Sequence, residues 1–357
     1  MANVVAGGGT RTGSVVLAFA LAVLSGCERA DPPEPTGSAA AAYGNCTPSP
    51  APARPVAGNP LAGRPFFVDP NGPAALQVAR WEGQQRAADA AALRRISDRP
   101  VALWVGDDAG SVGARVDAVL GCAVAQGQLP VLVAYNIPNR DCGSYSSGGA
   151  ASRDEYRSWI RAFASGVRGR PVAVIVEPDA VAHAVEGCDS ESRYELLADA
   201  VQVLKATGSA VVYLDAGHPR WITDVNRLAA ALQRAGIAHA DGFSLNVANF
   251  VSTPDNVAYG NRISGAVPGK PHFVIDTSRN GAGEVETAGD VDGGPRWCNP
   301  PGRLLGKPPT TDTGDPRVDA LLWIKRPGES DGACRPGEPP AGQWWPEYAL
   351  DLAQRSA

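Results

Sequence analysis

The sequence predicts an α/β fold, a seven-stranded parallel (β/α) barrel related to the TIM barrel. Seven short apolar runs rich in β-branched residues recur along the chain, and amphipathic stretches separate most of them. Such runs are typical of parallel strands covered on both faces, because neither face meets water. Seven repeats in one domain favour a barrel over an open sheet, although periodicity alone does not exclude the open sheet.

The elements follow one another in a regular order. The expected strands are VALWV (101–105), VLVAY (131–135), VAVIV (172–176), VVYL (211–214), GFSL (242–245), FVI (273–275) and ALLWI (320–324). Helices are expected between them, for example at 155–167 (EYRSWIRAFASGV) and at 193–208 (RYELLADAVQVLKATG), where apolar residues recur with helical spacing.

The N-terminal part has the composition of an export signal and a linker. Residues 1–27 hold one arginine, an apolar stretch too short to span a bilayer, and the ending LSGC, which predicts a lipoprotein signal with acylation at Cys27. An ordinary signal peptide with an incidental cysteine is the alternative. Residues 28–60 are rich in Pro and Ala and predict a linker, so residues 61–357 form the one expected domain. The protein is thus expected outside the cell or on the outer face of the membrane, attached only through the lipid.

Charge and cysteine content exclude several function classes. The net charge of −5 and the pI of about 5.5 argue against binding to nucleic acid. Without Cys27, six of the seven cysteines remain, and an even number in an exported chain predicts disulfides. Six cysteines allow 15 pairings. The absence of CxxC and HxxxH spacings argues against a zinc site, and we expect no metal and no cofactor.

Acidic residues follow five of the expected strands. In a parallel barrel the loops after the strands share one face, so these side chains are expected to meet there. The residues of these loops are Asp141; Glu177 and Asp179; Asp215 with His218 and Trp221; Asp276 with Arg279; and Lys325, Glu329 and Asp331. An aspartate after a strand also often caps a helix or closes a turn, and Asp276 fits that structural role best. Glu177, before Pro178, can orient its neighbours instead of reacting.

Clustered carboxyl groups with tryptophans predict carbohydrate cleavage. Glycoside hydrolysis needs one protonated carboxylic acid and one carboxylate, and crowding like charges raises the pKa of one of them. Tryptophan faces offer flat apolar platforms for sugar rings. Three other histidines, at 183, 239 and 272, are expected to have ordinary structural roles.

Six blocks of the chain, in this order, resemble the cellulases of glycoside hydrolase family six: YNIPNRDCGSYSSGG, VIVEPDAV, YLDAGHPRW, DTSRNG, WCNPPGRLLG and LLWIKRPGESDGAC. The resemblance extends from about residue 64 to about residue 349. Its most specific parts are the Arg-Asp-Cys block and the Lys…Pro-Gly-Glu-Ser-Asp-Gly block. It implies a distorted seven-stranded α/β barrel that hydrolyses β-1,4-glucan with inversion at the anomeric carbon.

The resemblance also implies roles for single residues. Asp179 matches the general acid, and Asp141 matches a second aspartate that supports the acid's protonation and a water chain. Asp331 matches the candidate general base, whose direct role is debated in the family. Asp215 matches another aspartate of the cleft, and Tyr135 matches a tyrosine that presses on the distorted sugar.

Further positions match contacts to the glucan. Ser146, with Ser147 and Gly148, matches a mobile loop over the reaction site. The matched sugar-binding positions are Trp104, His218, Trp221, Asn249, Arg279, Trp297, Lys325 and Glu329. The segment WVGDDAG at 104–110 departs from the family pattern, and Val181 stands where Leu or Ile is usual. The implied disulfides are Cys142–Cys188 and Cys298–Cys334, which leaves Cys46 and Cys122.

Three functions remain open at this point: an endo-acting β-1,4-glucanase, an exo-acting cellobiohydrolase, and a non-catalytic glycan-binding lipoprotein. Only fourteen residues, KPPTTDTGDPRVDA, separate CNPPGRLLG from LLWIK, which is little material for a tunnel roof. We therefore expect an open cleft, endo action and a monomer. Retention of three aspartates of the cleft argues against binding alone, because binding needs no acid.

Overall fold

The structure is a computed structural model that describes residues 43, 46, 58–106, 111–285 and 289–356. All of these belong to one compact unit, Ser38–Ala357. The expected signal segment with Cys27 and residues 107–110 of the WVGDDAG segment lie outside the described residues. In the part of the chain that the structure describes, each helix is too short or too polar to cross a membrane.

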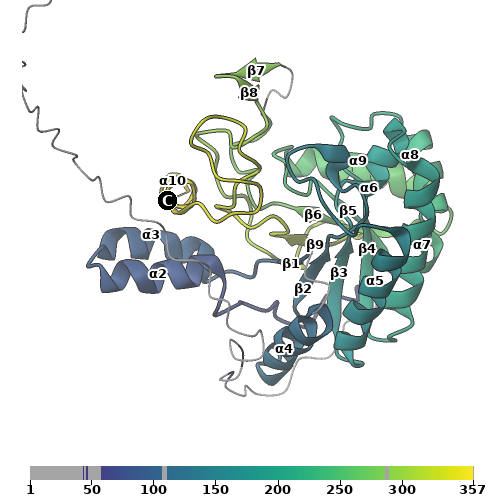
Figure 1. The fold of residues 1–357 in the computed structure, drawn as a ribbon, viewed down its shortest axis with the longest axis horizontal. Coiled ribbons are helices and arrows are strands. Elements are labelled where there is room, and N and C mark those ends of the chain that lie inside the picture. Colours follow the sequence, from purple (N-terminus) through teal and green to yellow (C-terminus); the bar gives the residue numbers. More distant parts are fainter. Residues whose placement is uncertain (1–42, 44–45, 47–57, 107–110, 286–288, 357) are drawn as a thin grey trace, which may run out of the picture. The chain divides into compact units, whose positions relative to one another are not determined.

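Seven parallel strands form a single curled sheet, as the sequence predicts (Figure 1). They are β1 (Leu103–Val105), β2 (Val131–Ala134), β3 (Val172–Val176), β4 (Ala210–Asp215), β5 (Gly242–Leu245), β6 (His272–Asp276) and β9 (Val318–Leu322). Their order in the sheet is their order in the sequence, and every neighbouring pair is parallel. The two edges of the sheet meet just outside the strands, where Ala102 N donates to Trp323 O at 2.9 Å. The sheet is therefore a barrel that closes at one point and lacks a ladder between β1 and β9.

Helices connect most of the strands. They are α2 (Pro73–Gly83), α3 (Ala87–Ser97), α4 (Val112–Ala125), α5 (Arg153–Val167), α6 (Ala180–Glu186), α7 (Ser190–Lys205), α8 (Val225–Arg234), α9 (Thr253–Ala266) and α10 (Pro346–Arg355), with short 3₁₀ turns η1 (Asp141–Gly143) and η2 (Ile237–His239). Between β6 and β9 the described chain holds only the small hairpin of β7 (Asp290–Val291) and β8 (Gly294–Pro295). The last crossover is therefore built from irregular chain, and one wall of the site comes from it.

The alternation of side chains along each strand divides the core into two layers. In β2, Leu132 and Ala134 pack outward among residues of the helices, whereas Val131 and Val133 face the barrel interior with residues such as Tyr213. Both faces are apolar, which explains why the strands appear in the sequence as unbroken apolar runs.

The stretch expected to be a linker is attached to the domain at two described residues. Cys46 forms a disulfide with Cys122 of α4. Tyr43 donates a hydrogen bond to the Asp69 carboxylate at 3.0 Å. The domain therefore includes contacts from before residue 61.

Candidate active site

The carboxyl ends of the strands place the expected site residues along one end of the barrel, because all seven strands are parallel. Tyr135 follows β2, Asp179 lies two residues beyond Glu177 after β3, Asp215 ends β4, Asn249 follows β5, Arg279 follows β6, and Lys325 follows β9. Sequence order and strand polarity are thus enough to gather these side chains.

Asp179 and Asp215 form the first group of carboxyl groups. Asp215 lies at the end of β4 with no exposed surface, and its Oδ2 accepts from the Asp179 backbone N–H at 2.9 Å. Its Oδ1 accepts from the Ser244 hydroxyl at 2.9 Å. Burial raises the pKa of Asp215 to about 6. Burial, together with the charges of Asp215 and Asp141, raises the pKa of Asp179 well above its usual range. Asp179 is thus suited to hold a proton at neutral pH.

Asp141 divides its two oxygens between a loop and a histidine. Its Oδ2 accepts from the Ser146 backbone N–H at 2.8 Å, which closes the turn of the 141–148 loop. Its Oδ1 lies 3.4 Å from Nε2 of His183, on helix α6. The His183 ring meets the Trp221 ring edge-on with 5.0 Å between centroids. We expected a structural role for His183; in the structure its ring lies close to both Asp141 and Trp221, and its Nε2 makes no hydrogen bond to another described residue.

Several non-glycine residues near the reaction site have backbone angles in the left-handed region, and four of them lie in the loops of Asp141 and Asp179. These four are Asp141 (φ 55°), Cys142 (φ 48°), Glu177 (φ 47°) and Asp179 (φ 71°). Each such residue costs about 1–3 kcal/mol and persists only where its surroundings hold it, a pattern that clusters at functional sites. The Cys142–Cys188 disulfide joins the loop of Asp141 to the end of α6, the helix that Asp179 precedes.

Arg140 holds the shape of the 141–148 loop from inside. Its guanidinium donates to the carbonyls of Tyr135 at 2.9 Å, Ser146 at 2.9 Å and Ser147 at 3.4 Å. It also lies over the Tyr135 ring, 4.6 Å from the centroid. The loop can therefore keep its form with little regular secondary structure.

Glu177 is a positioning group, the second of the roles considered for it. It has no exposed surface, and its carboxylate accepts from the backbone N–H groups of Asn136 (2.9 and 3.0 Å) and Ile137 (3.0 Å). Burial raises its pKa to about 7. These bonds fix the chain that follows Tyr135.

Asp331 belongs to a second group, in which neighbouring cations lower the pKa of the carboxyl group instead of raising it. Its Oδ2 accepts from Arg279 Nη1 at 2.9 Å and from the Asn299 backbone N–H at 3.0 Å, while Lys325 Nζ lies 3.5 Å from Oδ1. Burial alone would raise the pKa of Asp331, but Arg279 and Lys325 outweigh it and hold the pKa below its usual value. Asp331 is therefore ionised under the conditions in which Asp179 holds its proton.

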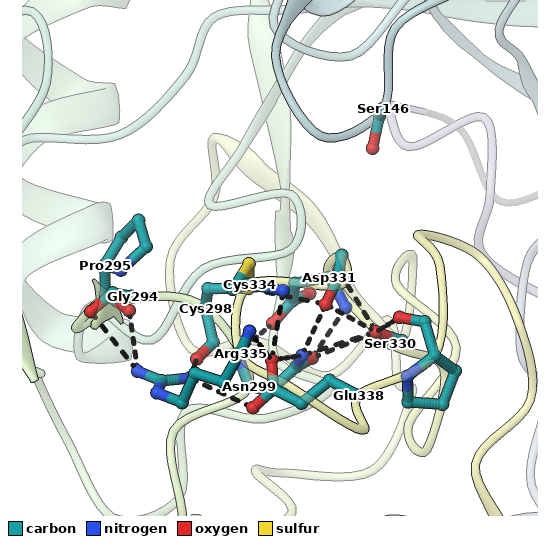
Figure 2. The surroundings of a disulfide bond; sticks show 12 residues. Ser146, Gly294, Pro295, Cys298, Asn299, Ser330, Asp331, Cys334, Arg335 and Glu338 are labelled. Atoms are coloured by element: carbon teal, nitrogen blue, oxygen red, sulfur yellow. Dashed lines mark hydrogen bonds and ion pairs between the residues drawn. A yellow bond between two sulfur atoms is a disulfide. The ribbon is translucent and has the colours of Figure 1, made fainter. Parts of the chain in front are cut away.

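The second disulfide lies beneath Asp331. Figure 2 shows Asp331 and Ser330 beside the Cys298–Cys334 bridge, with Asn299 between them. Ser146, from the loop of Asp141, is drawn on the other side of Asp331 (Figure 2).

The aromatic candidates occupy three different places. Trp221 lies beside His218, with 5.9 Å between ring centroids, and its indole N–H donates to Glu186 at 2.9 Å. Trp104 meets Tyr135 edge-on at 5.0 Å and donates to the Ile324 carbonyl at 2.8 Å. These two tryptophans therefore stand beside different strand ends.

Trp297 lies beside the 141–148 loop. Its ring meets that of Tyr145 edge-on at 5.7 Å. Tyr145 also covers Gly332, where an added Cβ would lie 2.7 Å from the Tyr145 Cβ. The loop of Asp141 and the turn of Asp331 thus touch each other through Tyr145.

Three remaining candidates make mainly local contacts in the structure. The Asn249 side-chain amide donates to the Val247 carbonyl at 3.2 Å. Glu329 is buried and pairs with Arg326 at 2.6 Å. His218 is buried, which lowers its pKa to about 4 and keeps the ring neutral near neutral pH.

Asp276 has the structural role expected for it. Its carboxylate accepts from the backbone N–H groups of Ala248, Ser278, Ile324 and Lys325, at 2.9–3.2 Å. It therefore joins the ends of β5, β6 and β9 and is not free to react.

Sequence reasoning overlooked Arg140, Arg193 and Asn299, and it gave His183 only a structural role. Arg193 of α7 is buried and donates to the carbonyls of Cys188 at 3.0 Å and Asn139 at 2.5 Å, beneath the Cys142–Cys188 bridge. Two of these residues could have been found from their place in the sequence. Arg140 directly precedes Asp141, and Asn299 directly follows Cys298.

Among the described residues, potential metal ligands gather at Cys298, Cys334 and Glu338. The two sulfurs are joined to each other. They are therefore not thiolates, and this group is a poor fit for a metal ion.

Comparison with known proteins agrees with this architecture. The chain is 44% identical over 296 residues to Endoglucanase A of Cellulomonas fimi, covering 82% of this chain and 61% of the relative. It is 42% identical over 299 residues to Endoglucanase 1 of Streptomyces halstedii, covering 80% of this chain and 88% of the relative. The chain thus spans about three fifths of the length of the first of these relatives.

A solved structure shares the fold. The endoglucanase Cel6 of Mycobacterium tuberculosis, in complex with methyl-cellobiosyl-4-deoxy-4-thio-β-D-cellobioside, matches with a TM-score of 0.76 and 46% identity, covering 83% of this chain and 99% of that chain. This TM-score means that the two structures share the curled seven-stranded fold described above. The family model "Glycosyl hydrolases family 6" matches residues 61–356. The chain therefore belongs to glycosyl hydrolase family 6.

Proposed function

We propose that the protein hydrolyses β-1,4-glucosidic bonds of cellulose or a related β-glucan, within the chain and with inversion at the anomeric carbon. One observation carries this proposal: burial and neighbouring carboxylates raise the pKa of Asp179, while Arg279 and Lys325 hold the pKa of Asp331 low. Two carboxyl groups whose pKa values are pushed apart supply the acid and the carboxylate that glycoside cleavage requires.

In this reaction Asp179 protonates the glycosidic oxygen as the bond to the anomeric carbon breaks. A water molecule attacks that carbon from the opposite face, and its proton passes toward Asp331. The low pKa of Asp331 makes it a weak base. It can accept the proton only late, when bonding to the electron-poor carbon has made the water acidic.

The other groups prepare the acid and the sugar. The charges of Asp141 and Asp215 favour the protonated form of Asp179. Tyr135 faces the sugar at the bond that breaks. The proposed glucan contacts are Trp104, Ser146, His218, Trp221, Asn249, Arg279, Trp297, Lys325 and Glu329.

The domain assignment and location belong to the same proposal. Residues 61–357 are the catalytic domain, residues 28–60 the linker, and residues 1–27 an export signal whose Cys27 carries the lipid. Disulfides, of which the structure has three, fit an exported protein. We propose a monomer.

Endo action is supported by the names of the two curated relatives, both called endoglucanases. Exo action is the second candidate. It is favoured by the contact of Tyr145 with Trp297 and Gly332, which brings two loops of the site together.

The deciding experiment incubates the purified protein with a soluble substituted cellulose and follows viscosity, reducing ends and the anomer released. The proposal expects a rapid fall in viscosity with few new reducing ends, and an α-anomer as first product. Steady release of cellobiose at nearly constant viscosity would favour exo action. A β-anomer, or a covalent adduct with a fluorosugar, would exclude inversion. Binding without cleavage would favour the non-catalytic glycan-binding alternative.

A further inference from the structure

The turn that carries Asp331 lies outside regular secondary structure. Residues 330–334 form no helix or strand, and the segment around residue 299 that contacts them is equally irregular. Ladder hydrogen bonds therefore do not fix the Asp331 carboxylate. The Cys298–Cys334 disulfide brings the two segments together, and Ser330 bonds to the backbone of Gly332 and Pro339, but neither of these contacts reaches the Asp331 carboxylate or its backbone N–H.

Asn299 makes three hydrogen bonds to Asp331 and Gly332 in this turn. Its side-chain Oδ1 accepts from the Asp331 backbone N–H at 2.7 Å, and its Nδ2 donates to the Gly332 carbonyl at 2.9 Å. Its own backbone N–H donates to Asp331 Oδ2 at 3.0 Å. The side chain and the backbone of one residue thus hold both the main chain and the carboxylate of Asp331 (Figure 2).

The partners also fix which way the amide of Asn299 points. Nδ2 faces two groups that only accept, the Gly332 carbonyl and a carboxylate oxygen of Glu338 at 3.0 Å. Oδ1 faces a backbone N–H, which only donates. A flipped amide would break all three bonds. An aspartate at this position would set a carboxylate oxygen against the Glu338 carboxylate and the Gly332 carbonyl.

Glu338 anchors Asn299 from below. Besides Asn299, its Oε2 accepts from the backbone N–H groups of Cys334 at 3.2 Å and Arg335 at 3.1 Å. Its Oε1 accepts from Arg335 Nη1 at 3.1 Å. The same Nη1 also donates to the Cys298 carbonyl at 2.9 Å, and the other two guanidinium nitrogens of Arg335 donate to further carbonyls of the facing segment. Both charged side chains are largely buried, with 11% and 14% of their surface exposed.

We propose that Asn299 and Glu338 are positioning residues for Asp331, linked in a chain that runs from Arg335 through Glu338 and Asn299 to the carboxylate. This inference rests on the proposed hydrolytic function, since it assigns these residues to the geometry of that reaction. A shift of about 1 Å in a reacting group can cost about 10²-fold in rate, so a carboxylate on an irregular turn needs such support.

The proposal is tested with four variants of the full chain. Asn299→Asp and Glu338→Ala remove the link, whereas Glu338→Gln keeps an oxygen for Asn299 and loses only the pairing with Arg335. Asn256→Asp is the matched control, because Asn256 is also a fully buried amide that donates to two carbonyls, those of Val251 and Ser252 at 3.0 Å, but in helix α9.

Two readouts are measured on each variant: kcat and KM on soluble glucan, and the amide hydrogen exchange of the peptide that contains residues 330–332. We expect Asn299→Asp and Glu338→Ala to lower kcat about 10- to 100-fold with KM changed less than about twofold, and to speed exchange in that peptide. Glu338→Gln should recover most of the lost kcat. Asn256→Asp should leave exchange of residues 330–332 at the wild-type rate.

Each other result overturns the inference. Faster exchange with unchanged kcat means that the network holds the turn without serving the reaction. Lower kcat with unchanged exchange means that the residues act by another route, and equal losses in all four variants mean a general loss of stability. If the wild-type protein does not cleave glucan at all, the proposed function fails, whereas the exchange data still decide whether Asn299 and Glu338 hold the turn.

Discussion

Replacing Arg279 with leucine should be one of the most costly single changes in the site. The Arg279 side chain has no exposed surface, and that of Asp331 has 6%, with 2.9 Å between Nη1 and Oδ2. At an effective dielectric constant of about 20, two unit charges about 4 Å apart, a typical separation of the charge centres in such a pair, attract by about 4 kcal/mol. Removing one partner of a buried pair typically costs about 3–5 kcal/mol, because the other charge stays buried. Lys325, 3.5 Å from Asp331, limits the loss.

We therefore expect Arg279→Leu to lower the free energy of unfolding by about 3–4 kcal/mol. It should also lower kcat, because the higher pKa of Asp331 favours its protonated form, which cannot accept a proton from water. The assay is urea unfolding at pH 7 with the disulfides intact. It is applied to the wild-type protein, to Arg279→Leu, to Asp331→Asn and to the double variant that carries both changes. The double-mutant cycle isolates the pair, and its coupling energy should be about 3 kcal/mol.

A matched control is the exposed pair of Arg234 and Glu191, whose side chains are 47% and 81% exposed. The same cycle there should give a coupling energy below about 1 kcal/mol. If the coupling of Arg279 with Asp331 is equally small, the buried ion pair does not set the state of Asp331, and the reasoning for an ionised carboxylate at that position fails.

Three further predictions concern single residues. Asp179→Ala should lower the rate on natural glucan about 10²–10⁴-fold but spare substrates with good leaving groups, and equal losses on both would contradict its role as acid. Burial lowers the pKa of His218 to about 4 in the folded protein, whereas in the unfolded chain the imidazole has its ordinary pKa of about 6.5. Between these two pH values only the unfolded chain binds the proton, so the free energy of unfolding should fall by up to about 3 kcal/mol as the pH is lowered from 6.5 to 4. His218→Gln should remove that part of the pH dependence in urea unfolding, and an unchanged slope would refute the assignment. His183→Asn should lower kcat about tenfold, because it removes the ring that packs beside Asp141 and Trp221. The exposed His239→Asn is the control, and identical kinetics for the two variants would exclude a role of His183 in placing Asp141.

The strands could be predicted because a strand that is buried on both faces has an apolar residue at nearly every position. The expected runs at 172–176 and 242–245 coincide with β3 and β5, and the other strands differ by one or two residues at their ends. The site residues at strand ends followed from the same signal, since strand polarity decides which loops share a face.

The remaining site contacts could not be read from the sequence, because they join irregular segments that have no period. His183 reaches Asp141 across 42 positions, and Asn299 reaches Asp331 across 32 positions. The sequence around a histidine on a short helix, or around an asparagine before two prolines, is the same whether the side chain faces water or a catalytic loop. Arg140 likewise has the appearance of a surface charge until the loop is seen to wrap around it.

The Cys46–Cys122 bridge also determines how far the barrel can move from whatever holds the start of the chain. If Cys27 carries the lipid, as proposed, nineteen residue steps separate that anchor from Cys46. A fully extended chain of that length reaches at most about 65 Å. Without the bridge the free segment would continue for the fifteen further steps from Cys46 to Leu61, and its greatest reach would increase by about 50 Å. The bridge also makes α4 the point of attachment, so pulling forces would act on the helix between β1 and β2, and the strand ends that carry Asp179 and Asp331 would not bear them directly.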